Sequence, residues 1–468
     1  MKRQISIQTS TTMASGTYML AEGDAGSNSD ASEDDNSSET EWTKEVSDFP
    51  SSPLTAPFTG VSGGPAHDAP VLDFLALYLD DGFFYVLASQ TNLYAEQCRS
   101  AAQQAGKPHQ TKWNPTSSLE MRAFVSINIA MGFKVQLQLY DYWSTDPLCN
   151  DPWISETMSR NRFIALNRYL HLSDSTQAPG RDMENYDPLY KVRPLVDSLN
   201  IKFPQFFKPG KNLSIDESMI GFKGKHHFKQ YCPKKPTKWG FKVWTLCDSS
   251  NGYFLRFDVY TGKAITADRS VVRREFGLGY DVVTNLANDY FDVGHHIYFD
   301  RYFSSLHLCE YLLSRATYSC ATILLNRRGL PDDAKKAKLK QEGELVEYQK
   351  GEVLLSIAFH KRQISFLSTG QEIGKMATPH ETRACVNYNY NCHMGGVDKG
   401  NQNVFYYSVG RSGRKWWRYI FWWGINVSII NAYVIWKETH NNTAGQAASR
   451  PRHKCTHLYF RKEVVKAL

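Results

Sequence analysis

The chain has 468 residues and a mass of 53.4 kDa, which is more than one hydrophobic core usually supports. Its hydrophobic content of 42% excludes a wholly disordered chain, and nine scattered cysteines without a C-x-x-C pair exclude a small disulfide-bonded scaffold. The net charge of +7 hides a charge of −9 over residues 21–50, so the other 438 residues carry +16 and suit a polyanion such as nucleic acid.

The first segment of the chain, residues 1–65, is rich in Ser, Thr, Gly, Asp and Glu and poor in aliphatic side chains. Such a segment cannot bury enough apolar area to offset the entropy of ordering, so a disordered acidic tail is predicted. Residues 1–20 contain no sustained apolar run, and no cleavable signal peptide is expected. The tail suits either a phosphorylated regulatory segment or a solvated leader.

Residues 66–207 are predicted to form a mainly helical region, because apolar residues recur there three and four positions apart. A serine opens the segment that begins LEMRAF, which is typical of a helix N-terminus. The predicted helices span residues 71–98, 118–139, 159–172 and 190–207.

The apolar period changes at Leu213, where short segments rich in β-branched and aromatic residues begin. LSIDESMIGF, FKVWTLCD and YFLRFDVYTG predict three antiparallel strands, and a helix over residues 282–290 follows them. The strand HHIYFD, the helix SSLHLCEYLLSRA and the strand CATIL come next. Antiparallel strands that then alternate with helices predict an α/β or α+β layer fold, with the first part of its core over residues 208–325.

The remaining chain divides into three parts. Residues 326–390 hold the charged run RRGLPDDAKKAKLKQEGE and two strand-like pieces, and are predicted to be an insertion domain. Residues 391–440 return to the core with a helix, and residues 441–468 are predicted to be a basic C-terminal tail.

The stretch Trp416 to Trp436 is long enough to cross a membrane. Four polar residues interrupt it, and it follows a long polar chain, so a buried helix is predicted in place of a membrane span. These residues are Arg418, Asn426, Ser428 and Asn431.

Three aspartates stand at positions where an acidic side chain is costly. Asp216 lies inside a predicted strand, Asp300 ends another, and Asp398 opens a helix after a Gly-Gly turn. A carboxylate in an apolar strand needs a charged partner or a metal ion, so these three could converge to hold a pair of divalent cations. Each could instead be a helix cap or a salt-bridge partner.

The sequence around each aspartate resembles one catalytic segment of the piggyBac family of DNA transposases. These segments are SIDESMIGFKGKHHFKQYCPKKPTKWGFKVWTLCDSSNGYF, IYFDRYFSSLHLCEYLL and MGGVDKGNQ, in the family's order, and the resemblance spans residues 70–437. It implies a DDE-type recombinase with an RNase H-like catalytic core, an insertion domain, and a preceding helical region for dimerisation and DNA binding. Asp216, Asp300 and Asp398 would be the catalytic aspartates and would hold two Mg²⁺ ions, for which Mn²⁺ could substitute.

The resemblance also implies a substrate and partners. The family nicks DNA at transposon ends, forms and opens a hairpin, and joins the ends to TTAA targets. A nuclear homodimer that binds double-stranded DNA, with no membrane association, is therefore expected.

Two departures from the family pattern leave a second interpretation open. Many relatives carry a further aspartate where this chain has Asn401, which is neutral and a weaker metal ligand. Relatives commonly end in a Cys/His-rich zinc domain, whereas this chain has only His453, Cys455 and His457 near its end, and no structural zinc is predicted. A domesticated, transposase-derived DNA-binding protein without strand-transfer activity is the alternative.

Basic residues follow the first and third aspartates, interleaved with aromatic ones. Lysine and arginine neutralise phosphates, and aromatic rings stack on unpaired bases, although a solvated charged face would have the same composition. The neighbouring histidines 295 and 296 would point to opposite faces of a strand and are interpreted as structural. The predicted DNA contacts are Lys223, Lys225, Lys234, Lys235, Lys238, Lys242, Arg411, Arg414 and Lys415.

Overall fold

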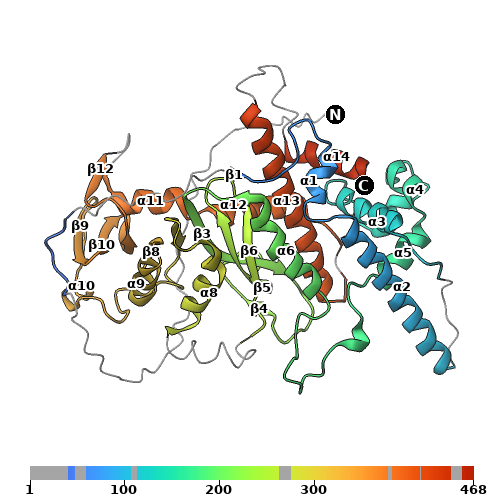
Figure 1. The fold of residues 1–468 in the computed structure, drawn as a ribbon, viewed down its shortest axis with the longest axis horizontal. Helices are drawn as coiled ribbons and strands as arrows, with labels where there is room; N and C mark the ends of the chain where they lie inside the picture. The colour runs from blue at the N-terminus through green and yellow to red at the C-terminus, as the bar shows by residue number, and fades with distance from the viewer. Residues whose placement is uncertain are drawn as a thin grey trace, which may run out of the picture.

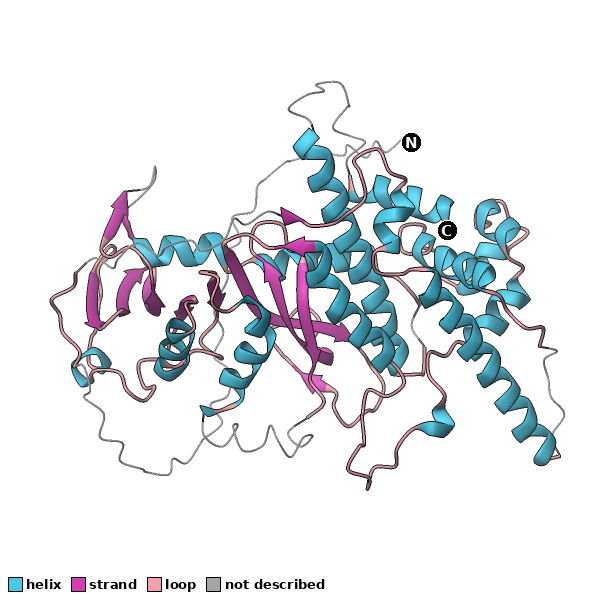
Figure 2. Ribbon diagram, viewed as in Figure 1, coloured by secondary structure: helices cyan, strands magenta, loops and turns pink. Residues whose placement is uncertain are grey.

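The computed structural model describes residues 41–47, 60–106, 113–262, 276–377, 382–411, 413–443 and 456–468. A mixed sheet runs through the middle of the molecule (Figures 1 and 2). The N-terminal helices gather at one end together with the last two helices, and residues 332–377 lie at the other end. The molecule is therefore a mixed α/β protein, as the sequence predicts.

Within the described residues the large sheet has nine strands in the order β4-β5-β3-β7-β8-β11-β10-β9, and β6 also pairs with β5. β3 pairs antiparallel with β5 and parallel with β7, which itself runs parallel to β8. The strands are β3 Asn212–Gly221, β4 Gln230–Tyr231, β5 Trp239–Asp248, β6 Phe254–Val259, β7 His296–Phe299, β8 Tyr318–Thr322, β9 Leu345–Lys350, β10 Val353–His360 and β11 Arg362–Thr369.

The predicted insertion continues the central sheet. β11 pairs antiparallel with β8, and β10 and β9 follow outward, so the backbone ladder passes from the core strands into this segment without a break. A small hairpin of β12 Lys375–Ala377 and β13 Thr382–Ala384 leads back to the core.

The N-terminal region is helical, and its boundaries are set by local caps. The long predicted helix over residues 71–98 is in fact two helices, because the Asp80 side chain accepts a hydrogen bond from the Phe83 amide and starts a new helix. The Ser117 side chain caps the next helix in the same way. The helices are α1 Val71–Ala76, α2 Asp81–Gln104, α3 Ser118–Ala130, α4 Pro152–Thr157, α5 Arg160–Tyr169 and α6 Arg193–Phe206.

Short helices connect the strands of the core and two longer helices close the chain. β1 Gly60–Val61 pairs with β2 Phe207–Lys208 and fastens the start of the helical region to its end. The remaining helices are α8 Leu278–Ala287, α9 Leu306–Ser314, α10 Asp332–Lys335, α11 Cys385–His393, α12 Gly396–Tyr406, α13 Trp417–Thr443 and α14 His457–Ala467, and three-residue to five-residue 3₁₀ turns lie at Leu139–Trp143, Ser175–Gln177 and Asn288–Tyr290.

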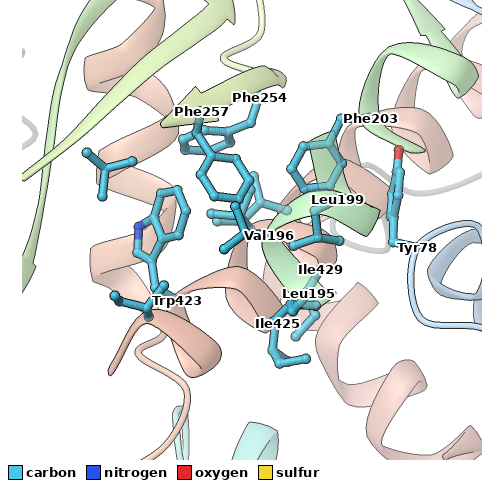
Figure 3. Packing of buried hydrophobic residues seen from close by; sticks show 14 of the residues in the cluster. Tyr78, Leu195, Val196, Leu199, Phe203, Phe254, Phe257, Trp423, Ile425 and Ile429 are labelled. Carbon is cyan, nitrogen blue, oxygen red and sulfur yellow. The ribbon is translucent and has the colours of Figure 1, made fainter. Parts of the chain in front are cut away.

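Helix α13 contains the apolar stretch that is long enough to cross a membrane, and most of it is buried inside the protein. Its apolar side chains pack between α6 and β6; Figure 3 shows Trp423, Ile425 and Ile429 among them. Asn431, one of its buried polar residues, is fully hydrogen-bonded to the backbone of Phe254. Its side chain accepts from the Phe254 amide at 2.9 Å and donates to the Phe254 carbonyl at 2.8 Å. Asn200 of α6 does the same for Phe257, so two amides complete the hydrogen bonds of the outer side of β6.

Both ends of the chain differ from the sequence-based expectation. Residues 41–47 fall inside the predicted disordered tail, yet Thr43 bridges to Gln349 of β9 and the Trp42 indole donates to the Gly329 carbonyl at 2.8 Å. The predicted basic tail includes α14, whose Phe460, Val464 and Val465 enter the main core. Residues 1–40, 48–59 and 444–455 of the two predicted tails lie outside the described residues.

Candidate catalytic site

Strand β3 and its parallel neighbour β7 place two of the three aspartates. Ser214 pairs with Tyr298 in the register of these strands, and the same register two residues further on puts Asp216 level with Asp300. Neighbouring strands lie about 4.8 Å apart, so the two carboxylates start from adjacent positions at one edge of the core. Asp216 is 21% exposed, and Asp300 is partly buried directly after the end of β7.

Helix α12 brings the third aspartate to the same face. The Val397 amide donates to the Ser214 hydroxyl at 3.1 Å, which seats the first turn of α12 two residues before Asp216. Gly396 permits this approach, because a Cβ there would lie 2.7 Å from the Asp248 carbonyl oxygen. The second glycine of the third motif is therefore a packing requirement, and the helix that starts there carries Asp398 in its first turn.

The electrostatics show that these carboxylates influence one another. Burial raises the pKa of Asp216 well above its usual range, and the charges of Glu217 and Asp300 raise it further although Lys235 opposes them. Burial and the charge of Glu217 likewise raise the pKa of Asp300. Asp398 contributes to the same field, since its charge helps to raise the pKa of the Lys235 ammonium.

Glu217 is a fourth carboxylate that the sequence analysis did not select. Burial opposes its ionisation, but hydrogen bonding to Asp216 and the charges of Lys242 and Lys235 lower the pKa of Glu217 to about 2. It follows Asp216 in the SIDES run. The sequence could have indicated its role, because a second acidic residue in an apolar strand also needs a cationic partner.

Two of the predicted DNA contacts serve this carboxylate cluster instead. The Lys235 ammonium lies 2.8 Å from Asp216 Oδ2 and 3.4 Å from Glu217 Oε2. Lys242 lies 3.0 Å from Glu217 Oε1 and over the rings of Trp244 and Tyr302. Lys235 reaches the cluster from a loop that folds back onto β3, and Lys242 reaches it from the neighbouring strand β5, so both ammonium groups balance buried negative charge.

Of the other predicted DNA contacts, two side chains form hydrogen bonds within the protein and five are exposed. Arg411 donates to the carbonyl oxygens of Gln136 and Leu137, and Lys415 donates to the Arg168 carbonyl at 3.1 Å. Both therefore tie the segment before α13 to the helical region. The exposed members are Lys223, Lys225, Lys234, Lys238 and Arg414.

Asn401 lies one turn after Asp398 on α12, and its side-chain amide faces the Glu217 carbonyl at 3.4 Å. This places position 401 beside the carboxylate cluster. His296 is buried within β7, and His295 Nδ1 donates to the Gly210 carbonyl at 3.1 Å.

The donor chemistry of the cluster fits a divalent metal. Among the described residues, no three His, Cys, Asp or Glu side chains are already gathered around one point as ligands. Asp216, Asp300 and Asp398 nevertheless offer hard oxygen donors of the kind that Mg²⁺ prefers, from three separate elements on one face. Burial, and then the neighbouring negative charges, raise the pKa values of Asp216 and Asp300, and the Lys235 ammonium group already supplies a cation beside Asp216.

A mixed sheet with aspartates at the same level of adjacent strands and a third on a helix packed against the sheet is the arrangement of an RNase H-like core, here in a DDE-type transposase fold. Residues 72–433 match a family model described as transposase IS4. The chain belongs to the piggyBac family of transposases and transposase-derived proteins.

The relatives and a solved structure agree with this assignment. Human piggyBac transposable element-derived protein 2 is 25% identical over 381 residues, covering 77% of this chain and 60% of the relative. Human piggyBac transposable element-derived protein 3 is 24% identical over 406 residues, covering 82% of this chain and 64% of the relative. The chain thus spans less than two thirds of the length of either relative.

The solved structure is that of the piggyBac transposase synaptic complex with hairpin DNA. It superposes with a TM-score of 0.72 at 22% identity, and the match covers 85% of this chain and 80% of that one. This similarity establishes the shared fold.

Proposed function

We propose that the protein is a DNA strand transferase that cuts DNA at transposon ends and joins the ends to TTAA targets. The observation that carries the proposal is the convergence of Asp216, Asp300 and Asp398 on one face of an RNase H-like core. Two Mg²⁺ ions held by these carboxylates, or Mn²⁺ in their place, would activate a water or a 3′ hydroxyl and stabilise charge on the leaving oxygen.

The protein's own residues would position the partners of this reaction. β3 and β7 fix Asp216 and Asp300 side by side, and the Ser214 hydroxyl fixes the start of α12 beneath Asp398. The exposed Lys223, Lys225, Lys234, Lys238 and Arg414 would neutralise phosphates of double-stranded DNA, which the charge of +16 outside the acidic segment favours. A substrate of this kind also supports a nuclear location and a homodimer with one site for each transposon end.

A DNA cleavage assay tests the proposal. Purified protein is incubated with Mg²⁺ and duplexes that carry candidate inverted repeats beside TTAA, and nicks and hairpins are separated on denaturing gels. We expect both products to disappear in Asp300→Asn, which keeps the shape of the side chain and removes its charge.

The matched control is Asp292→Asn, eight residues earlier. Asp292 forms a surface ion pair with Arg315 and has φ of +63°, a conformation that asparagine adopts readily. This control should retain full cleavage. Equal cleavage by Asp300→Asn and the wild type would exclude the proposed active site.

A second candidate function, a DNA-binding protein without strand transfer, is favoured by Asn401 beside the carboxylates. Specific binding of the same duplexes without nicking, at every Mg²⁺ concentration, would support it.

The oligomeric state is measured by light scattering, where a homodimer has twice the chain mass of 53.4 kDa.

A further inference from the structure

The loop between β4 and β5 holds one lysine inside the carboxylate cluster. The loop is pinned at its base, because the Cys232 amide donates to the Lys238 carbonyl at 2.8 Å and the Lys235 amide donates to the Cys232 carbonyl at 3.2 Å. This turn directs Lys235 back onto β3, while Lys234 and Lys238 on either side are exposed.

Three oxygen atoms surround the Lys235 ammonium. They are Asp216 Oδ2 at 2.8 Å, the Glu217 backbone carbonyl at 3.3 Å and Glu217 Oε2 at 3.4 Å. An ammonium group has three N–H donors, so these three oxygen atoms can accept all of its hydrogen bonds. The same oxygens are hard donors that would suit a divalent cation.

We propose that Lys235 is a built-in cation that holds the carboxylate cluster together in the metal-free protein and is displaced when a divalent metal binds. The inference rests on the proposed function in one respect only, that Asp216 is a metal ligand. It assigns Lys235 a positioning role that a phosphate-contacting lysine would not have.

The competition follows from charge and from geometry. A dication bound through Asp216 Oδ2 would compete with the Lys235 ammonium group, because both need the same oxygen atom and repel each other. Lys235 has a flexible four-carbon stem and can leave, whereas Lys242 is held between the Trp244 and Tyr302 rings, at 3.9 and 4.8 Å from their centroids. Lys242 therefore remains to balance Glu217 after Lys235 departs.

Metal binding by a neutralised variant provides the first test. Mn²⁺ is titrated into Lys235→Gln, and free Mn²⁺ is followed by electron paramagnetic resonance. Removing the competing charge should tighten Mn²⁺ binding about tenfold. The control Lys234→Gln removes an equal charge from the adjacent exposed residue and should bind Mn²⁺ as the wild type does.

A second measurement needs only the wild-type protein and so does not depend on the folding of a variant. The rate of reductive methylation of Lys235 is measured by mass spectrometry with and without Mn²⁺, with Lys234 as the internal reference. Displacement predicts a several-fold faster modification of Lys235 when Mn²⁺ is present and an unchanged rate at Lys234.

Unchanged Mn²⁺ affinity in Lys235→Gln, or an unchanged methylation rate at Lys235 in the wild type, would overturn the inference. Neither readout uses DNA cleavage. If the protein shows both effects but does not cut DNA, the displacement of Lys235 by metal stands and the proposed strand transfer is wrong.

Discussion

At position 401, the difference between an amide and a carboxylate side chain would change the charge of the carboxylate cluster. The Asn401 amide faces the Glu217 carbonyl at 3.4 Å, a weak hydrogen bond that gives the helix no strong anchor there. An aspartate in its place would bring a carboxylate oxygen and one negative charge beside Glu217, one helical turn from Asp398.

Asn401→Asp should lower the Mg²⁺ concentration required for half-maximal cleavage by about tenfold, because changes beside a metal site commonly alter affinity 10- to 100-fold. The measurement is a Mg²⁺ titration of the nicking reaction. In contrast, Asp398→Asn should abolish cleavage at every Mg²⁺ concentration.

Gln402→Glu is the matched control for this charge change, since Gln402 is exposed on α12 and bonds to the Tyr406 hydroxyl. It should leave the Mg²⁺ titration unchanged. If both variants shift the Mg²⁺ titration equally, the effect comes from added negative charge anywhere on α12 and not from position 401.

His296 gives the protein a pH dependence that is independent of catalysis. Burial, together with the positive charges of Lys211, His393 and His295, lowers the pKa of His296 from 6.5 to about 3. The unfolded chain binds a proton below pH 6.5 and the folded chain does not, so folding stability falls as pH decreases through this window.

The free energy of unfolding should therefore drop by roughly 2 kcal/mol between pH 6.5 and pH 5 on account of this residue. Denaturant titrations across that range should show a shallower decline for His296→Gln than for the wild type. His67→Gln, at an exposed position, should follow the wild-type curve.

Sequence patterns single out individual aspartates as unusual more readily than they reveal where individual lysines point. Asp216 and Asp398 were recognisable because an acid in an apolar strand and an acid after two glycines are unusual. Lys235 and Lys242 were not, because Lys235 is directed by a turn that folds back onto β3 and Lys242 meets Glu217 across the pairing of β5 with β3, and both are tertiary features.

At the scale of elements, α14 holds the helix that carries Asp398. The Arg461 guanidinium is fully buried, donates to Asn426 Oδ1 and lies over the Tyr407 ring at the end of α12. Asn426 in turn donates to the Val404 carbonyl, one of the last carbonyls of α12, at 3.0 Å. Burial lowers the pKa of Arg461 to about 9, although the nearby Tyr407 opposes this shift.

Arg461→Ala should destabilise the protein by roughly 2–4 kcal/mol, because it leaves a cavity and a buried acceptor on Asn426 without its donor. Thermal unfolding measures the loss of stability, and hydrogen exchange should show faster exchange across α12. Lys462→Ala, an exposed neighbour on α14, should change neither. Loss of stability without faster exchange in α12 would show that Arg461 stabilises α14 alone.

Elements with a clear period were predictable and those defined by long-range contacts were not. The amphipathic pattern located α3, α5 and α13, and alternation of strands located β3, β5 and β6. No local pattern indicated that β11 would pair with β8, or that residues after 456 would form a core helix, since both depend on partners more than 40 residues away.

The whole molecule is basic outside its acidic segment, and this charge controls affinity for a polyanion. If Lys225 contacts a phosphate, then Lys225→Gln should weaken DNA binding and lower the slope of log affinity against log salt by about one unit. Fluorescence anisotropy across a salt series gives the slope. Lys466→Gln, at an exposed position paired with Glu463, should leave the slope unchanged.

The bridge between Thr43 and Gln349 has a meaning for the behaviour of the protein in concentrated solution. β9 ends the large sheet, and a strand with one unpaired side is a template on which a second molecule can add its own strand. The N-terminal segment covers part of that side and so guards against aggregation. A protein shortened to begin at residue 48 should associate as its concentration rises, and light scattering would register the growing particles.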